Sequence, residues 1–225
     1  VGISDEELSI PRASVADVYS LIIDDLTTAE TKMAGSGKGN SVSANEGAVK
    51  ALLARVYLYN EQWGNAVTKA QEVIDMGYQL VDSTSYASLY EEQATNSEII
   101  FQIDFANDDD VNAIADYFMP DARFEVAAWR TTAREQSIAD EFEEGDYRKE
   151  ATVGVIPFQG VDEFYCKKYD DIVGESDNVI VLRLAEMYLI KAEALNEQSY
   201  EADGDAFVAL NTIRERAGLT ELTSA

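Results

Sequence analysis

The stretch RLAEMYLIKAEALNEQ, residues 183–198, decides the fold of this chain. Its spacing predicts a helix, and at 100° per residue four of its charged side chains fall within one arc of roughly 80°. Apolar side chains cover most of the remaining circumference. A helix that is apolar on more than one side packs between neighbours, as it does in stacked helical repeats. The arc holds Arg183, Glu186, Glu193 and Glu197, and the apolar residues are Leu182, Leu184, Ala185, Tyr188, Leu189, Ala192 and Leu195.

The residues that follow predict a partner for this helix. Ala206, Leu210, Ile213 and Ala217 share one helical face, and Gly218 stands where a left-handed C-cap is expected. Residues 180–218 therefore predict a helical hairpin. The central helix of such an array is expected to be scaffold, and its residues are poor candidates for contact with a ligand.

An earlier segment predicts a second hairpin. Ser43 and Glu46 have the spacing of a capping box and open a helix over about 44–60. A second helix is expected over about 65–76, ended by Gly77, and the short link requires antiparallel packing. Trp63 near the turn is interpreted as a packing residue. The tetratricopeptide-like spacing is carried by Leu53, Ala54, Tyr57, Ala66, Ala70 and Val73.

A leading helix precedes this hairpin. Ser14 and Asp17 have capping-box spacing, and the helix is expected to end near Gly35. GSGKGN, residues 35–40, is predicted to be a loop, because it lacks the Gly-Lys-Ser/Thr ending of a phosphate-binding loop. The apolar stripe of the helix consists of Val15, Val18, Tyr19, Ile22, Leu26, Ala29 and Met33.

Between the two hairpins the pattern changes. EIIFQIDF, residues 98–105, alternates as a half-buried strand does, with Ile99, Phe101, Ile103 and Phe105 expected to face the core. Glu98, Gln102 and Asp104 are expected to face solvent. From 106 to about 175 the sequence is irregular, with one short helix near 138–144. A long insertion of this kind in a compact domain usually carries function.

Charge and composition exclude several classes of function. The net charge is −26, with 43 acidic and 17 basic residues, and this balance disfavours nucleic-acid binding. Histidine is absent, which removes the usual general base and the commonest metal ligand. The single cysteine, Cys166, is interpreted as a packing residue. With so many carboxylates, the presence of a possible acid pair is no evidence for a glycosidase, and nothing in the sequence singles out one pair. We predict that the chain is not an enzyme.

Five blocks of the sequence, in order, resemble the SusD/RagB family of outer-membrane nutrient-binding lipoproteins of Bacteroidetes-type bacteria. VLRLAEMYLIKAEAL followed by ALNTIRERAGL is its hallmark. The other blocks are PRASVADVYSLIIDDLTTAE, VSANEGAVKALLARVYLYNEQWGNAVTKAQEVI, SEIIFQIDF and FEEGDYRK, the last with the family-like Glu143, Asp146 and Arg148. Asp146 and Arg148 are interpreted as a structural ion pair or cap. Against the family pattern, we expect this chain to lack the usual N- and C-terminal segments.

The resemblance implies a mainly α, tetratricopeptide-like fold in a single SusD-like domain. Helical repeats are expected over about 13–77 and 178–218, with an irregular, short-strand ligand-face insertion over about 98–177. It also implies non-catalytic binding of a glycan, or sometimes a peptide, at the cell surface. The ligand would pass to a SusC-like TonB-dependent transporter in the outer membrane, and the full-length family pattern includes a lipid anchor.

Candidate ligand-binding residues lie in DYFMPDARFEVAAWRTT, residues 116–132, because rings stack on sugar faces and charged groups bind hydroxyls. They are Trp129, Arg130, Tyr117, Phe124, Arg123 and Asp121. Asp108, Asp109 and Asp110 are a weak candidate for calcium, and a solvated loop is favoured there. No cofactor is expected otherwise. The alternative function is that of a helical-repeat interaction protein or a structural surface subunit.

Overall fold

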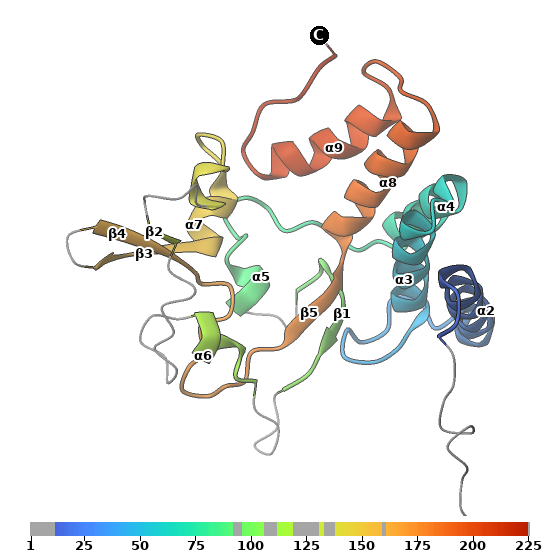
Figure 1. Ribbon diagram of the computed structural model, residues 1–225, viewed down its shortest axis with the longest axis horizontal. Coiled ribbons are helices and arrows are strands. Elements are labelled where there is room, and N and C mark those ends of the chain that lie inside the picture. The colour runs from blue at the N-terminus through green and yellow to red at the C-terminus, as the bar shows by residue number, and fades with distance from the viewer. Residues whose placement is uncertain are drawn as a thin grey trace, which may run out of the picture.

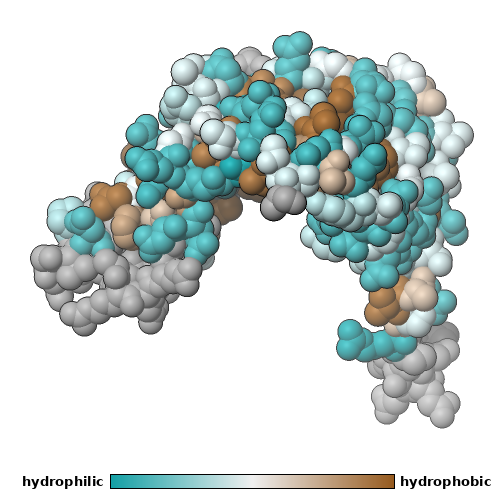
Figure 2. Space-filling model, turned by 90° about the horizontal axis from the view of Figure 1, so that it is seen from above, coloured by the Kyte–Doolittle hydropathy of each residue, from teal (hydrophilic) through white to brown (hydrophobic). Residues whose placement is uncertain are grey.

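The computed structural model describes residues 12–91, 96–105, 112–118, 131–132, 138–158 and 161–224. Five longer helices form one side of the molecule, and short helices and strands form the other (Figure 1). Seen from above, the molecule curves into an arch whose visible surface is largely hydrophilic (Figure 2). The longer helices are α2 (Val15–Met33), α3 (Glu46–Tyr59), α4 (Trp63–Asp75), α8 (Leu184–Gln198) and α9 (Asp205–Arg216).

Helix α2 begins as predicted and packs less deeply than predicted. The Ser14 hydroxyl accepts from the backbone N–H of Asp17 at 3.1 Å, which makes Ser14 the N-cap as predicted. The Asp17 carboxylate accepts from the Ser14 hydroxyl at 2.7 Å and not from its backbone N–H, as a capping box would require. None of its residues is buried. Val15, Val18 and Ile22 of the predicted stripe are exposed, so that part of the prediction is wrong. The helix packs mainly against α3 and rests there on the half-buried remainder of the stripe.

Helix α3 has a different cap from the one predicted. The side chain of Asn45 accepts from the N–H of Ala48 at 2.9 Å, so Asn45 and not Ser43 is the N-cap. Glu46 does not form the capping box: its Oε1 pairs with the Lys50 ammonium one turn later in α3, at 3.0 Å. Its Oε2 accepts from the N–H groups of Gly35 and Gly37 at 2.9 and 3.4 Å and fixes the preceding loop. The capping-box prediction fails because that loop offers Glu46 other donors.

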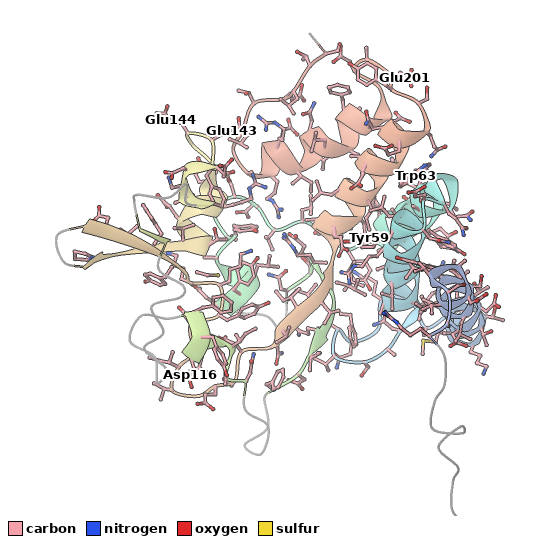
Figure 3. All side chains as sticks on the ribbon, viewed as in Figure 1. Tyr59, Trp63, Asp116, Glu143, Glu144 and Glu201 are labelled. Carbon is pink, nitrogen blue, oxygen red and sulfur yellow. The ribbon has the colours of Figure 1, made fainter. Side chains whose placement is uncertain are left out.

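The α3–α4 hairpin confirms the repeat prediction. Gly77 has φ +83, in the left-handed region expected after a helix end. Trp63 begins α4 and packs against the main core (Figure 3). Small side chains allow the two helices to approach closely, and Ala51, Ala54, Ala66 and Ala70 are fully buried.

Helix α8 lies between α4 and α9, which is the environment that its sequence predicts (Figure 1). The Lys191 ammonium donates to the side-chain oxygen of Gln71 at 2.7 Å and links α8 to α4. Leu189 was expected on the apolar face and is 41 % exposed, so its placement is corrected. The buried residues are Leu184, Ala185, Met187, Ile190, Ala192 and Ala194.

Strand β1 (Ile99–Ile103) pairs antiparallel with β5 (Val179–Arg183), which runs directly into α8. The strand is where the sequence predicts it, and its facing is wrong. Glu98 and Gln102 are buried, whereas Ile103 is 48 % exposed. Register shifts between Ile99 and Gln102 break the strict alternation. Internal partners account for their burial: Nε2 of Gln102 donates to the Ser41 hydroxyl at 3.1 Å, and the partners of Glu98 are described below.

The described residues between β1 and β5 include more strands than the sequence predicts. A three-stranded sheet has the order β2–β4–β3, with β2 (Thr131–Thr132), β3 (Val153–Phe158) and β4 (Val161–Cys166). In place of one helix near 138–144 there are a 3₁₀ turn η3 (Ile138–Asp140) and α7 (Tyr147–Thr152). Two further short helices are α5 (Ser88–Glu91) and α6 (Ile114–Phe118).

Strand β3 is not recognisable from the sequence because it contains Gly154 and Pro157, and glycine and proline normally mark turns. Gly154 pairs with Tyr165, and a Cβ at residue 154 would run into the Tyr165 ring. Pro157 is tolerated because β3 is an edge strand of the sheet. In the described parts of the chain, none of the helices combines the length and the hydropathy that a membrane span requires.

Candidate functional site

A cavity of about 450 Å³ lies between the helical repeats and the β2–β4–β3 sheet. The loop before α7 forms one wall, β3 and β4 form another, and Arg183 at the junction of β5 and α8 contributes from the repeat side. Its aromatic lining consists of Tyr86, Phe118, Phe142, Phe164 and Tyr165. Its charged lining consists of Glu141, Glu143, Asp146, Arg148, Lys168 and Arg183.

The aromatic wall depends on the close pairing of β3 and β4. Because Gly154 has no side chain, the Tyr165 ring can lie directly against the neighbouring strand. Phe164, one residue earlier, pairs with Thr131 of β2 and is half-buried. Cys166 ends the strand, is half-buried and also lines the cavity, so the packing role predicted for it agrees with its position.

A buried carboxylate anchors the repeat side of the cavity. Glu98 is fully buried, and its two oxygens accept from Nη1 of Arg183 at 3.1 Å and Nη1 of Arg216 at 2.8 Å. The N–H of Val81 donates to the same carboxylate at 3.0 Å. A charge at this depth is tolerated only because it is paired and hydrogen-bonded. The guanidinium of Arg216 also lies 4.9 Å from the centroid of the Tyr86 ring.

Arg183 keeps its charge in this setting. Burial alone would lower the pKa of its guanidinium, but Tyr86, Tyr90 and the Glu98 carboxylate together raise that pKa above its ordinary value. Its side chain is only 28 % exposed. We expected the stretch 183–198 to be scaffold without ligand contact, and its first residue, Arg183, lines the cavity.

Asp146 and Arg148 form the structural pair that the sequence predicts. Asp146 caps α7 by accepting from the N–H of Arg148 at 2.9 Å, and it also accepts from Nη2 of the Arg148 guanidinium at 2.6 Å. Burial raises the pKa of the Asp146 carboxyl, but Arg148 outweighs that effect and holds the pKa below its ordinary value. Both side chains line the cavity, so the pair also shapes the site.

The loop before α7 is docked on α9. Glu143 accepts from the Arg214 guanidinium at 2.6 and 3.0 Å, and this contact lowers the pKa of the Glu143 carboxyl. The N–H of Tyr147 donates to the carbonyl of Ala217 at 3.1 Å. Figure 3 shows Glu143 on the α9 side of the loop and Glu144 farther from that helix. The wall of the cavity therefore rests on a repeat helix.

Lys168 follows β4 and completes the charged lining. Its ammonium lies 5.4 Å from the centroid of the Tyr90 ring, and it makes no ion pair with a carboxylate of the described residues. Tyr90 in turn packs edge-on against Tyr86 and Tyr169, with ring centroids 6.1 and 5.9 Å apart. Among the described residues, the Lys168 ammonium therefore contacts an aromatic ring and no carboxylate.

The predicted ligand residues are only partly placed. Tyr117 lies in α6 and is 47 % exposed, directly before the cavity residue Phe118. The rest of the prediction lies outside the described residues, namely Asp121, Arg123, Phe124, Trp129 and Arg130. The calcium candidates Asp108, Asp109 and Asp110 also lie outside them. The described residues contain no group of three or more acidic or cysteine side chains placed to hold a metal ion.

Sequence reasoning missed most of the cavity lining. Phe142, Phe164 and Tyr165 lie in stretches that the sequence indicates only as irregular. A usable signal was present in EFYCKKY, residues 163–169, where aromatic residues and lysines adjoin. The spatial link from this stretch to Arg183 depends on long-range packing, which no local pattern encodes.

Comparison with known proteins supports one family. A sequence model of the SusD family matches residues 148–225. The SusD-like protein P25 of Formosa agariphila is 25% identical over an alignment of 263 residues, which covers 93% of this chain and 49% of the relative. This chain thus spans about half the length of the curated relative that it matches.

Solved structures share the fold. A SusD superfamily protein from Bacteroides vulgatus is 28% identical, with a TM-score of 0.72 over 92% of this chain and 48% of that one. A SusD-like carbohydrate binding protein from the same species is 24% identical, with a TM-score of 0.76 over 96% of this chain and 46% of that one. The matching family model and these likenesses show that the chain is similar to proteins of the SusD family in its C-terminal part and shares their fold.

Proposed function

We propose that this protein binds carbohydrate, without cleaving it, in the cavity between the β2–β4–β3 sheet and the helical repeats. The observation that carries the proposal is the lining of the 450 Å³ space, in which five aromatic side chains stand beside paired and unpaired charged groups. A cavity of this volume falls within the usual range for small-ligand sites. The carbohydrate-binding likeness from Bacteroides vulgatus supports the same class of ligand.

The chemistry of the lining suits a sugar. Phe142, Phe164 and Tyr165 offer apolar ring surface for the CH faces of a pyranose. Arg148 and Arg183 offer donors for hydroxyl groups, and their carboxylate partners hold them in place before a ligand arrives. Groups that are ordered in advance lose less conformational entropy on binding, which favours affinity.

The carboxylates of the cavity favour binding over hydrolysis. A glycosidase requires one carboxyl group that is protonated near neutral pH, and such a group has a raised pKa. At Asp146 and Glu143 the pKa is instead lowered, by Arg148 and Arg214 respectively. Both side chains are therefore anionic and engaged in ion pairs at neutral pH, and neither is suited to act as a general acid.

The family suggests the place of this activity in the cell. Binding at the outer face of the outer membrane, next to a SusC-like TonB-dependent transporter, would deliver the captured glycan for import. Co-purification of such a transporter with the full-length protein from membranes tests this part of the proposal. Recovery of the protein without any transporter, under conditions that preserve other transporter complexes, would argue against it.

Calorimetry against a panel of oligosaccharides and peptides tests the binding proposal. We expect saturable binding of at least one saccharide, and we expect Phe142→Ala to weaken it about tenfold through the loss of one stacking ring. Tyr59→Ala is the matched control, because Tyr59 is 70 % exposed at the end of α3, among the helical repeats, and does not line the cavity (Figure 3). Binding of peptides alone, or equal effects of the two variants, would contradict the proposal.

A further inference from the structure

The charge of the cavity differs from the charge of the rest of the chain. The protein carries a net charge of −26, yet three cationic side chains line this one cavity: Arg148, Lys168 and Arg183. Arg216 lies directly behind them on the same carboxylate as Arg183. Three carboxylates, Glu141, Glu143 and Asp146, line the same cavity, so its lining has no excess of acid while the chain as a whole does, and a ligand with negative charge is repelled less there than elsewhere.

The ion pairs of the cavity leave positive charge in excess. Arg148 is matched by Asp146, but Arg183 and Arg216 share the single carboxylate of Glu98. Lys168 has no carboxylate partner among the described residues. The side chain of Arg216 is only 6 % exposed, and its Nε is buried without a hydrogen-bond partner. Excess charge at such depth is screened weakly by solvent.

The acidic side chains of the lining do not cancel this excess. Glu143 is engaged by Arg214 of α9, and Asp146 is engaged by Arg148. Glu141 is exposed to solvent, where its charge is screened more strongly than the charges in the interior. The inner part of the cavity is therefore positive, and the negative groups are paired or lie at the solvent side.

We propose that the cavity selects an anionic saccharide, one that carries a carboxylate or a sulfate ester, and that Lys168 is its main anion-binding residue. Arg183 and Arg148 assist with the guanidinium donors that Glu98 and Asp146 leave unused. The inference rests on the proposed carbohydrate-binding function and names its ligand class. Hydrogen bonds between charged partners are roughly twice as strong as those between neutral ones, so the cavity should bind an anionic saccharide more tightly than a neutral one.

Pairs of ligands that share a sugar backbone and differ in charge distinguish recognition of charge from recognition of sugar shape. Hexagalacturonate is compared by calorimetry with its fully methyl-esterified form, which keeps the backbone and loses the carboxylates. An oligosaccharide of a sulfated galactan is compared with its desulfated form. We expect the protein to bind at least one acidic ligand about tenfold more tightly than its neutral counterpart. The two pairs distinguish a carboxylate from a sulfate ester as the recognised group.

Variants at two neighbouring lysines test the assigned residue. Lys168→Met is expected to abolish the preference for the acidic ligand, and Lys168→Arg to retain most of it. Lys167→Met is the control, because Lys167 is the preceding residue and does not line the cavity. Should Lys168→Met fail to fold, the ratio of affinities for acidic and neutral ligands in the unmodified protein still decides the anionic preference, and loss of that ratio in Lys168→Arg would overturn the assignment of Lys168.

The outcomes separate this inference from the proposed function. Equal binding of acidic and neutral forms, unaffected by Lys168→Met, overturns the anionic preference and leaves carbohydrate binding intact. Equal losses in Lys167→Met and Lys168→Met overturn the assignment of Lys168, since they indicate a general effect of net charge. Failure of a folded protein to bind any acidic or neutral saccharide overturns both proposals together.

Discussion

Arg216, the last residue of α9, donates from Nη1 to Oε2 of Glu98 at 2.8 Å, across a separation of 118 residues in the chain. Arg183 occupies the other oxygen of the same carboxylate. One buried acid thus joins β1, the start of α8 and the end of α9. These are the elements that carry the repeat side of the cavity, so the contact serves both the core and the site.

Replacing Glu98 by glutamine should destabilise the protein strongly. The substitution leaves two guanidinium groups near a fully buried position without their counter-charge, and breaking a buried pair in this way costs about 3–5 kcal/mol. Urea unfolding followed by circular dichroism measures the free energy of unfolding. Glu193→Gln removes the same charge from an exposed position on α8 and should change that free energy by less than about 0.5 kcal/mol. Comparable losses in both variants would contradict the role of Glu98.

A side chain at residue 154 should disturb the cavity. Gly154→Val places two methyl groups where the Tyr165 ring lies, so β3, β4 or the ring must move. We expect a loss of about 1–3 kcal/mol in stability, as for other overpacked sites, together with weaker saccharide binding. Tyr165→Ala in the same chain should recover part of the stability, and a double-mutant cycle measures that coupling.

Gly64 provides the contrast for this substitution. It lies in α4, and nothing stands within 4 Å of a Cβ built there. Gly64→Ala should leave binding unchanged and raise stability by up to about 1 kcal/mol, because alanine favours the helix. A loss of stability there as large as that of Gly154→Val would show that the crowding at Tyr165 is not the cause.

Two alanine variants distinguish the predicted cap of α3 from the observed one. Asn45→Ala removes the acceptor of the Ala48 N–H and should reduce stability by about 1 kcal/mol. Ser43→Ala should have almost no effect, because its hydroxyl caps nothing in α3. Thermal unfolding of the two variants side by side gives the comparison, and the reverse order of stability would restore Ser43 as the cap.

Acid should loosen the loop that forms the cavity wall. The pKa of Asp146 lies below its ordinary value of 3.8, so its ion pair contributes full stability above that value and loses it as the pH falls through the folded-state pKa. Glu143 acts in the same direction through Arg214. Asp177 opposes them, since burial raises its pKa and its contribution is lost as the pH rises.

Unfolding midpoints in urea at pH 7 and pH 3 measure this dependence. Asp146→Asn removes one of the groups that titrate, so its stability should fall less between the two pH values than that of the unmodified protein. Asp75→Asn, on α4, is a control of equal charge. An unchanged pH dependence in Asp146→Asn would remove that ion pair from the explanation.

The sequence predicts the helical repeats well because their information is local. The predicted alanines at 54, 66 and 70 indicate close helix packing through their spacing, and the structure buries all three. The helix at 184–198 is likewise recognisable from its narrow charged arc. Leu189 and Val15 are exceptions, because exposure depends on which neighbouring helix covers a face, and spacing does not contain that information.

The cavity could be predicted only in part because its lining is assembled from distant segments. The alternating pattern of the strand predicts that Glu98 faces solvent. Its burial follows only from the contacts with Arg183 and Arg216, which are distant in sequence. The rings of Phe164 and Tyr165 belong to a sheet whose glycine and proline resemble turn signals. Of the ligand residues proposed from sequence, Tyr117 is the one that lies among the described residues, where it adjoins the cavity residue Phe118.

The three contacts of Glu98 also set the order in which the protein completes its folding. Val81 precedes the carboxylate by 17 residues, whereas Arg216 follows it by 118. During synthesis the chain emerges from its N-terminus, so the first hairpin and β1 are available long before the second counter-charge exists. The acid at residue 98 therefore stays hydrated at least until residue 216 has been synthesised. Closure of the core around it is therefore a late and slow event, as expected for contacts between residues so far apart in sequence.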